Sequence, residues 1–149
     1  MSHKKNTNLA PAIIEINYVK LADVSTIDFG SLPKSRIVNL NHGAVWSNIY
    51  FTPGKISFEE PITDSSAGRI WQQNLTLFFP GIDLTDKSDF DNYENIRFLV
   101  KFKYSNGDQY LIGTKVNPCK FSLNYSSNDG GSTISFYKNA NQPAYILQV

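Results

Sequence analysis

Cysteine and histidine are nearly absent from the chain. Its 149 residues include one cysteine, Cys119, and two histidines, His3 and His42. A lone cysteine forms no disulfide within the chain, so the fold has no disulfide framework. The usual zinc sites need four ligands from cysteine and histidine, and these three residues cannot supply them. We therefore expect no bound metal and no other cofactor.

Charge is also scarce. Charged residues make up 18% of the chain and the net charge is +1, whereas soluble domains average about 25% charged residues. Near-neutrality argues against a basic nucleic-acid-binding protein. No apolar run approaches the ~18 residues of a transmembrane helix, so we expect no membrane partner. Residues 1–10 are polar and lack the apolar segment of a signal peptide. We interpret them as a flexible N-terminal arm that precedes a single β domain over residues 11–149.

Small neutral polar residues and aromatic residues dominate what is present. Asn and Ser contribute 15 residues each, and aromatics make up 13%. This composition is too aromatic for a disordered chain and is typical of β proteins. Apolar alternation and regularly spaced turns predict about ten short strands, and therefore an all-β, single-domain antiparallel sandwich or barrel. The expected strands cover residues 14–18, 36–40, 45–51, 55–59, 69–79, 97–104, 109–112, 121–125, 133–137 and 144–149, with a polar loop at 61–68.

One segment breaks the β pattern. Residues 83–94 hold five acidic side chains and one lysine, and Thr85 or Ser88 could cap a helix there. Acidic residues in the first turn also suit a helix N-terminus, so we expect one short helix near residues 85–93. The same acids do not have the spacing or the central glycine of a calcium-binding loop.

Catalytic motifs are missing. The chain has no Gly-x-Ser-x-Gly motif and no phosphate-binding glycine loop between a strand and a helix. His42 lies in an Asn-His-Gly turn, and the sequence shows no partner to orient it as a general base. We therefore predict no catalytic residues and no enzymatic activity.

Two surface features favour assembly. The acidic segment 83–94 precedes a basic segment that contains Arg97, Lys101 and Lys103. Patches of opposite charge suit head-to-tail contacts between copies, and ordinary mixing of charges on a surface explains them equally well. Alternation also places neutral polar side chains on one face of strand 69–79, which suits a surface that DNA passes without sticking or a plain solvent-facing surface. The candidate assembly residues are Gln72, Asn74, Thr76, Asp86, Asp89, Asp91, Glu94, Arg97, Lys101 and Lys103.

Several segments in the second half of the chain carry a resemblance to a known class. They are residues 68–75 (GRIWQQNL), 98–100 (FLV), 106–114 (NGDQYLIGT), 117–118 (NP), 132–136 (STISF) and 143–144 (PA). In this order they resemble small virion proteins of tailed phages and prophages of Bacteroidetes hosts.

The resemblance implies a tail-tube-like subunit that forms a ring, expected to be a hexamer, around a DNA channel. Strand 69–79 would then face the lumen, although the sequence offers no second long strand to pair with it. The implied partners are copies of the chain, other virion proteins and genomic DNA passing non-specifically. The implied location is the virion tail or neck, after assembly in the host cytoplasm. A head–tail connector, a tail terminator and a capsid-attached protein are alternatives.

A different class also fits the aromatic content. Trp46 and Trp71 lie near expected loops, where aromatic rings can stack on sugars, although tryptophan is equally common in sandwich cores. A carbohydrate-binding or adhesion module is therefore the alternative, with these two residues as its sugar-binding candidates.

Overall fold

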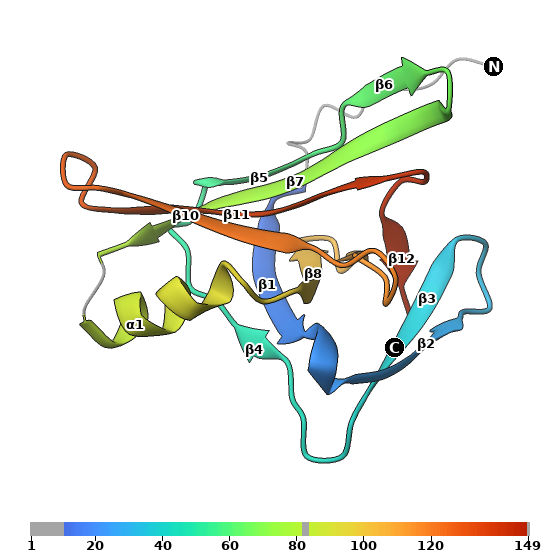
Figure 1. Cartoon of the computed structure of the whole chain (residues 1–149), viewed down its shortest axis with the longest axis horizontal. Coiled ribbons are helices and arrows are strands. Elements are labelled where there is room, and N and C mark those ends of the chain that lie inside the picture. The colour runs from blue at the N-terminus through green and yellow to red at the C-terminus, as the bar shows by residue number, and fades with distance from the viewer. Residues whose placement is uncertain (1–10, 82–83, 149) are drawn as a thin grey trace.

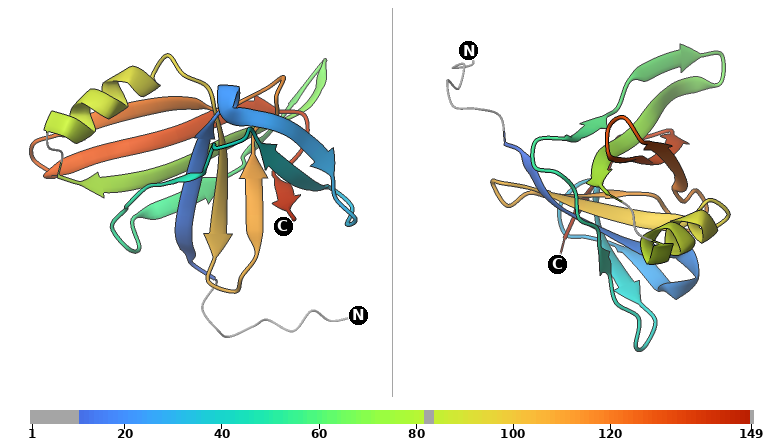
Figure 2. Two further views of the ribbon diagram at one scale, coloured as in Figure 1. Left: turned by 90° about the horizontal axis from the view of Figure 1, so that it is seen from below. Right: turned by 90° about the vertical axis from the view of Figure 1, so that its left-hand side faces the viewer.

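The computed structural model describes residues 11–81 and 84–148, and it describes the side chains of all of these except residues 84–87. The expected N-terminal arm, residues 1–10, lies outside the described residues. Two β-sheets face each other and a short helix lies beside them (Figure 1, Figure 2). The elements are β1 (Ile13–Lys20), the 3-10 helix η1 (Leu21–Asp23), β2 (Val24–Phe29), β3 (Ser35–Leu40), β4 (Ser47–Asn48), β5 (Ile56–Glu59), β6 (Ile62–Ser65), β7 (Gly68–Pro80), α1 (Leu84–Tyr93), β8 (Phe98–Tyr104), β9 (Gln109–Ile112), β10 (Lys120–Ser126), β11 (Gly131–Ala140) and β12 (Tyr145–Leu147).

The strands form an open sandwich. Sheet A has seven strands in the order β2-β3-β12-β9-β8-β1-β4, and sheet B has the order β10-β11-β7-β5, with β6 also paired to β7. The all-β sandwich with one short helix is confirmed, with twelve strands rather than about ten. Neither sheet closes into a barrel, so that alternative is wrong. One strand pair, β3 with β12, is parallel, whereas the prediction was wholly antiparallel.

The main hydrophobic core lies between the sheets. Sheet B contributes Leu75 and Phe136, and sheet A contributes Ile16 and Phe102, all of them 1% exposed or less. Period-two alternation puts these side chains on the facing sides of the two sheets. Helix α1 closes one end of the core through Phe90.

A second, smaller cluster covers the other side of sheet A. Leu99 and Leu111 are fully buried there, packed with Val24 and Trp46. Leu99 breaks the polar alternation on its face of β8, and this cluster explains why. The segment 19–46 and strand β12 cover that part of the sheet, so an apolar side chain is stable on both faces of β8.

Three strand predictions were wrong. The expected strand 45–51 is reduced to β4, and Val45 is 75% exposed. The expected loop 61–68 contains β6, whose residues are all exposed and show no apolar alternation. Strand β2 was not expected at all. Strand β6 forms because it pairs with β7, and strand β2 forms because it pairs with β3. The local sequence pattern indicates neither strand.

Candidate functional site

Two long strands form the centre of sheet B. Strands β7 and β11 pair over ten residue positions, from Pro80 opposite Gly131 to Trp71 opposite Ala140. The sequence predicted no long partner for residues 69–79. Strand β11 is that partner, because it extends beyond the expected 133–137 in both directions.

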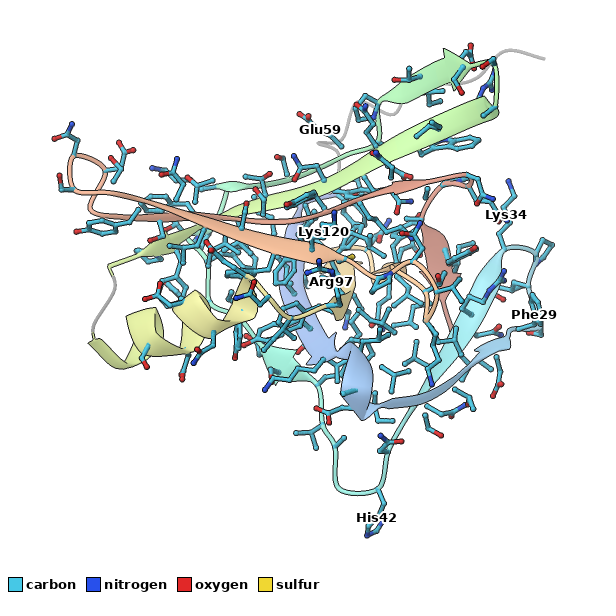
Figure 3. The ribbon with its side chains drawn as sticks, viewed as in Figure 1. Phe29, Lys34, His42, Glu59, Arg97 and Lys120 are labelled. Atoms are coloured by element: carbon cyan, nitrogen blue, oxygen red, sulfur yellow. The ribbon has the colours of Figure 1, made fainter. Side chains whose placement is uncertain are left out.

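The outer side of this pair is neutral. Gln72, Asn74, Thr76 and Phe78 on β7 lie opposite Asn139, Tyr137, Ser135 and Thr133 on β11, and none of these side chains is charged. We call this surface the polar face. Hydroxyl and amide groups interact across it: the Thr76 hydroxyl donates to Asn74 Oδ1 at 3.1 Å and lies 3.4 Å from Ser135 Oγ. Charges occur at its margins, on Glu59 of β5 and Lys120 of β10 (Figure 3). A third charge is that of Lys55, whose Nζ lies 4.9 Å from the centroid of the Phe78 ring.

The structure therefore places Gln72, Asn74 and Thr76 on one face. Gln72 and Asn74 are exposed and Thr76 is half-buried. Their role in assembly stays a prediction.

At one end of sheet B a hairpin extends beyond the sandwich. Strand β11 stops opposite Trp71, so residues 68–70 pair only with β6. We call residues 62–70 the ribbon. Residues 61–69 are all exposed, and the ribbon's Asp64–Arg69 ion pair, at 3.1 Å, is exposed too and so contributes little stability. Figures 1 and 2 show the ribbon extending away from both sheets.

The opposite end of β7 presents a different surface. Pro80 lies opposite Gly131, beside the turn between β10 and β11. Strand β10 is the edge of sheet B, and it carries no charged side chain from Phe121 to Ser126. Natural edge strands usually carry charges that block pairing with another chain. Residues 121–126 lack this protection by charge, although helix α1 packs against Phe121 of the strand through Phe90 and Tyr93.

The predicted acidic and basic residues stay apart. Asp89, Asp91 and Glu94 are exposed on or just after α1, and the side chain of Asp86 lies outside the described residues. Arg97 is exposed before β8. Among the described residues the one salt bridge is that of the ribbon, so no ion pair joins the described members of the two groups.

Lys101 and Lys103 lie on the side of β8 opposite Phe102. Lys101 Nζ lies 4.7 Å from the centroid of the Trp46 ring. Partial burial lowers the pKa of Lys101, and the nearby Glu15 carboxylate opposes that shift. The lysine is therefore packed against the second cluster rather than presented as a free charge.

The two candidate sugar-binding tryptophans do not form one surface. Trp46 is half-buried in the second cluster, against sheet A. Trp71 is half-buried on β7 of sheet B, opposite Ile62 and Ala140. The structure gives them no shared platform.

The residues that most often carry catalysis are isolated. His42 is exposed at the tip of the loop that follows β3 (Figure 3). Cys119 is fully buried and its thiol donates to the Ile112 carbonyl, at 3.4 Å. Burial raises the pKa of Cys119 to about 12, so the reactive thiolate is disfavoured. Within residues 11–81 and 84–148, no three histidine, cysteine or acidic side chains are grouped to hold a metal ion.

The described helices are too short and too polar to cross a membrane. The chain matches no family of known proteins, no curated protein and no solved structure. The resemblance to phage virion proteins therefore remains a hypothesis carried by its sequence segments alone.

Proposed function

We propose that this protein is a structural subunit that acts by assembling with copies of itself into a ring. The observation that carries the proposal is the ribbon. A two-stranded hairpin is only marginally stable in water by itself, yet residues 62–70 extend beyond the sandwich with Ile62 53% exposed. A contact with a neighbouring subunit would bury this side chain and stabilise the hairpin.

The two ends of sheet B suit a head-to-tail assembly. The ribbon lies at the start of β7, and the β10–β11 turn with the edge of β10 lies at its end. A contact between two different surfaces of identical subunits is head-to-tail, and it gives a closed ring or a filament. We assign the ribbon of one copy to the β10 end of the next.

The polar face supports a role around DNA. DNA-binding surfaces gain affinity by placing lysine and arginine on phosphates. The central strands of sheet B present only neutral side chains on that side. A ring that turned this face inward would let DNA pass without holding it, which is the property needed in a phage tail or neck. The hexameric ring, the contacts with other virion proteins and the connector, terminator and capsid-attached alternatives come from the sequence resemblance.

The proposal is tested by shortening the ribbon. Replacing residues 64–69 with Asn-Gly joins Thr63 to Ile70 through a favoured two-residue hairpin turn. The change removes two strand pairs, so side chains below it keep their faces. Light scattering after size-exclusion chromatography should give a ring mass for the wild type and a monomer mass for the shortened variant.

A matched control is available on the opposite sheet. Ile62→Asp puts a charge on the side chain that the contact would bury, so it should also give a monomer. Val45→Asp makes the same change at another exposed apolar residue, in the loop before β4, and it should leave the ring intact. A wild-type chain that stays monomeric at every concentration would refute the proposal. A shortened variant that assembles like the wild type, with both folded by circular dichroism, would refute the assignment of the ribbon.

A further inference from the structure

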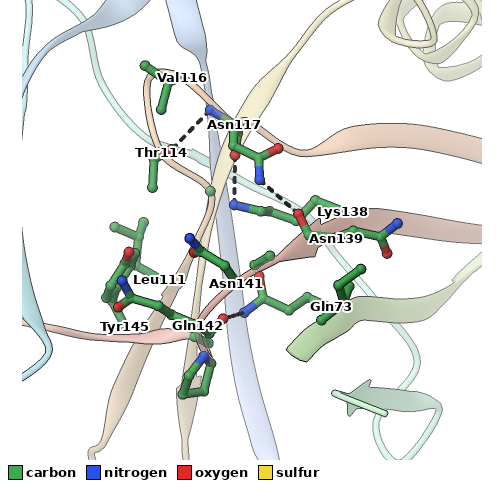
Figure 4. A pocket seen from close by; sticks show the side chains of 15 residues that line it. Gln73, Leu111, Thr114, Val116, Asn117, Lys138, Asn139, Asn141, Gln142 and Tyr145 are labelled. Carbon is green, nitrogen blue, oxygen red and sulfur yellow. Dashed lines mark hydrogen bonds between the residues drawn. The ribbon is translucent and has the colours of Figure 1, made fainter. Parts of the chain in front are cut away.

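A cleft opens at the end of the sandwich where β11 turns into β12. Its volume is about 580 Å³, and of the fifteen residues that line it only Lys138 is charged. Lys138 lies on β11, opposite Gln73 of β7. The loop at 113–117 forms the facing wall (Figure 4).

Lys138 is a buried cation without a counter-ion. Its side chain points inward like that of Phe136, and the residue is only 8% exposed. Its Nζ donates one hydrogen bond to the Asn117 carbonyl, at 2.8 Å. No carboxylate pairs with it among the described residues. Burial lowers the pKa of Lys138, as expected where a charge is removed from water without a partner.

Neutral amide side chains also line the cleft. They belong to Gln73, Asn117, Asn141 and Gln142, whereas the side chain of Asn139 lies on the polar face. The Gln73 amide is held in place, donating to the Gln142 carbonyl at 3.3 Å and to Glu60 Oε2 at 3.2 Å. The Asn117 amide donates to the Asn139 carbonyl at 2.8 Å.

One amide side chain in the cleft is available to hydrogen-bond a ligand. The side chain of Asn141 makes no hydrogen bond with another described residue, and it points into the cleft in Figure 4. An amide both donates and accepts, so it matches a hydroxyl group.

We propose that this cleft binds a sugar that carries one carboxylate, of the hexuronate type. The carboxylate would accept from Lys138 Nζ, and the sugar hydroxyls would pair with the amides. One buried positive charge balances one carboxylate, whereas a phosphate brings about two negative charges at neutral pH. Apart from Ile70, the lining residues lie outside the ribbon, so the inference does not depend on ring assembly.

The test is a titration of the full chain with galacturonate, galactose and acetate, followed by NMR and calorimetry. Lys138→Met removes the amine and keeps most of the side-chain volume. Because hydrogen bonds to charged groups contribute ~1.5–3 kcal/mol, galacturonate affinity should fall by roughly tenfold or more. Lys20→Met, at an exposed lysine on the other sheet, is the matched control and should bind as the wild type does.

Asn141→Ala is a second variant at an exposed position, so it should fold normally. It should weaken galacturonate binding by a smaller factor. The proposal is overturned if galacturonate does not bind, if galactose binds equally tightly, or if acetate binds with the same affinity as an adventitious anion only. It is equally overturned if folded Lys138→Met and Asn141→Ala retain wild-type affinity.

Discussion

Two neighbouring residues of β11 provide a sharp test of the sandwich. Phe136 faces the core with no exposed surface, and its ring lies 5.4 to 5.9 Å from those of Tyr18, Phe98 and Phe121. Tyr137 points the other way, onto the polar face, and is 40% exposed. Truncating a buried phenylalanine costs about 3–5 kcal/mol. Phe136→Ala should therefore lose that much stability, while Tyr137→Ala should lose about 1 kcal/mol or less.

Urea denaturation of the two variants measures the difference in the free energy of unfolding, and thermal denaturation measures it as a shift in Tm. For a chain of about 150 residues, ~1 kcal/mol corresponds to roughly 2–4 °C in Tm. Phe136→Ala should therefore lower Tm by about 6–20 °C, with Tyr137→Ala close to the wild type. Equal losses, or a larger loss for Tyr137→Ala, would refute the register of β11, because a slip of one residue exchanges the two faces.

Three further expectations concern single sites. A Cβ on Gly131 would overlap the Phe79 carbonyl oxygen and the Phe78 ring, so Gly131→Ala should lower the free energy of unfolding by about 1–3 kcal/mol; an unchanged urea midpoint would contradict the close approach. Ser132 Oγ is buried and has no hydrogen-bond partner among the described residues, so Ser132→Ala should be neutral or stabilising by about 1 kcal/mol, and a clear loss would point to a missed partner. The folded-state pKa of Cys119 is raised from 9.0 to about 12, so the folded chain keeps this proton longer than the unfolded chain does. Its contribution is complete below about pH 9 and is lost as pH rises toward 12, at up to about 1.4 kcal/mol per pH unit. Cys119→Ala should flatten that alkaline decline in urea midpoints, and an unchanged pH profile would refute it.

Strands with strong alternation were predictable from the sequence. Strand β8 alternates Phe98, Val100 and Phe102 with residues that are polar except for Leu99, and the Asn106-Gly107 turn marks its hairpin with β9. The acidic segment 83–94 gave the position of α1. In each case the local pattern and the tertiary environment agree.

Other features depend on contacts that the local sequence does not contain. Strand β6 reads as a loop because its residues are polar and exposed, and only pairing with β7 makes it a strand. Val45 and Tyr50 look like strand residues, but they are 75% and 63% exposed beside the short β4.

The cleft was equally hidden from sequence reasoning. From the sequence, a lysine near the polar end of a strand is expected at the surface. Only the fold shows that Lys138 is buried. Its one available signal is the even spacing from Ile134 and Phe136, which puts all three on the inner side of β11.

Self-assembly is the central claim, and negative-stain electron microscopy of the full chain tests it most directly. The account predicts closed rings of uniform diameter around a central channel in the wild type. Particles of monomer size alone, from a chain that is folded by circular dichroism, would contradict it.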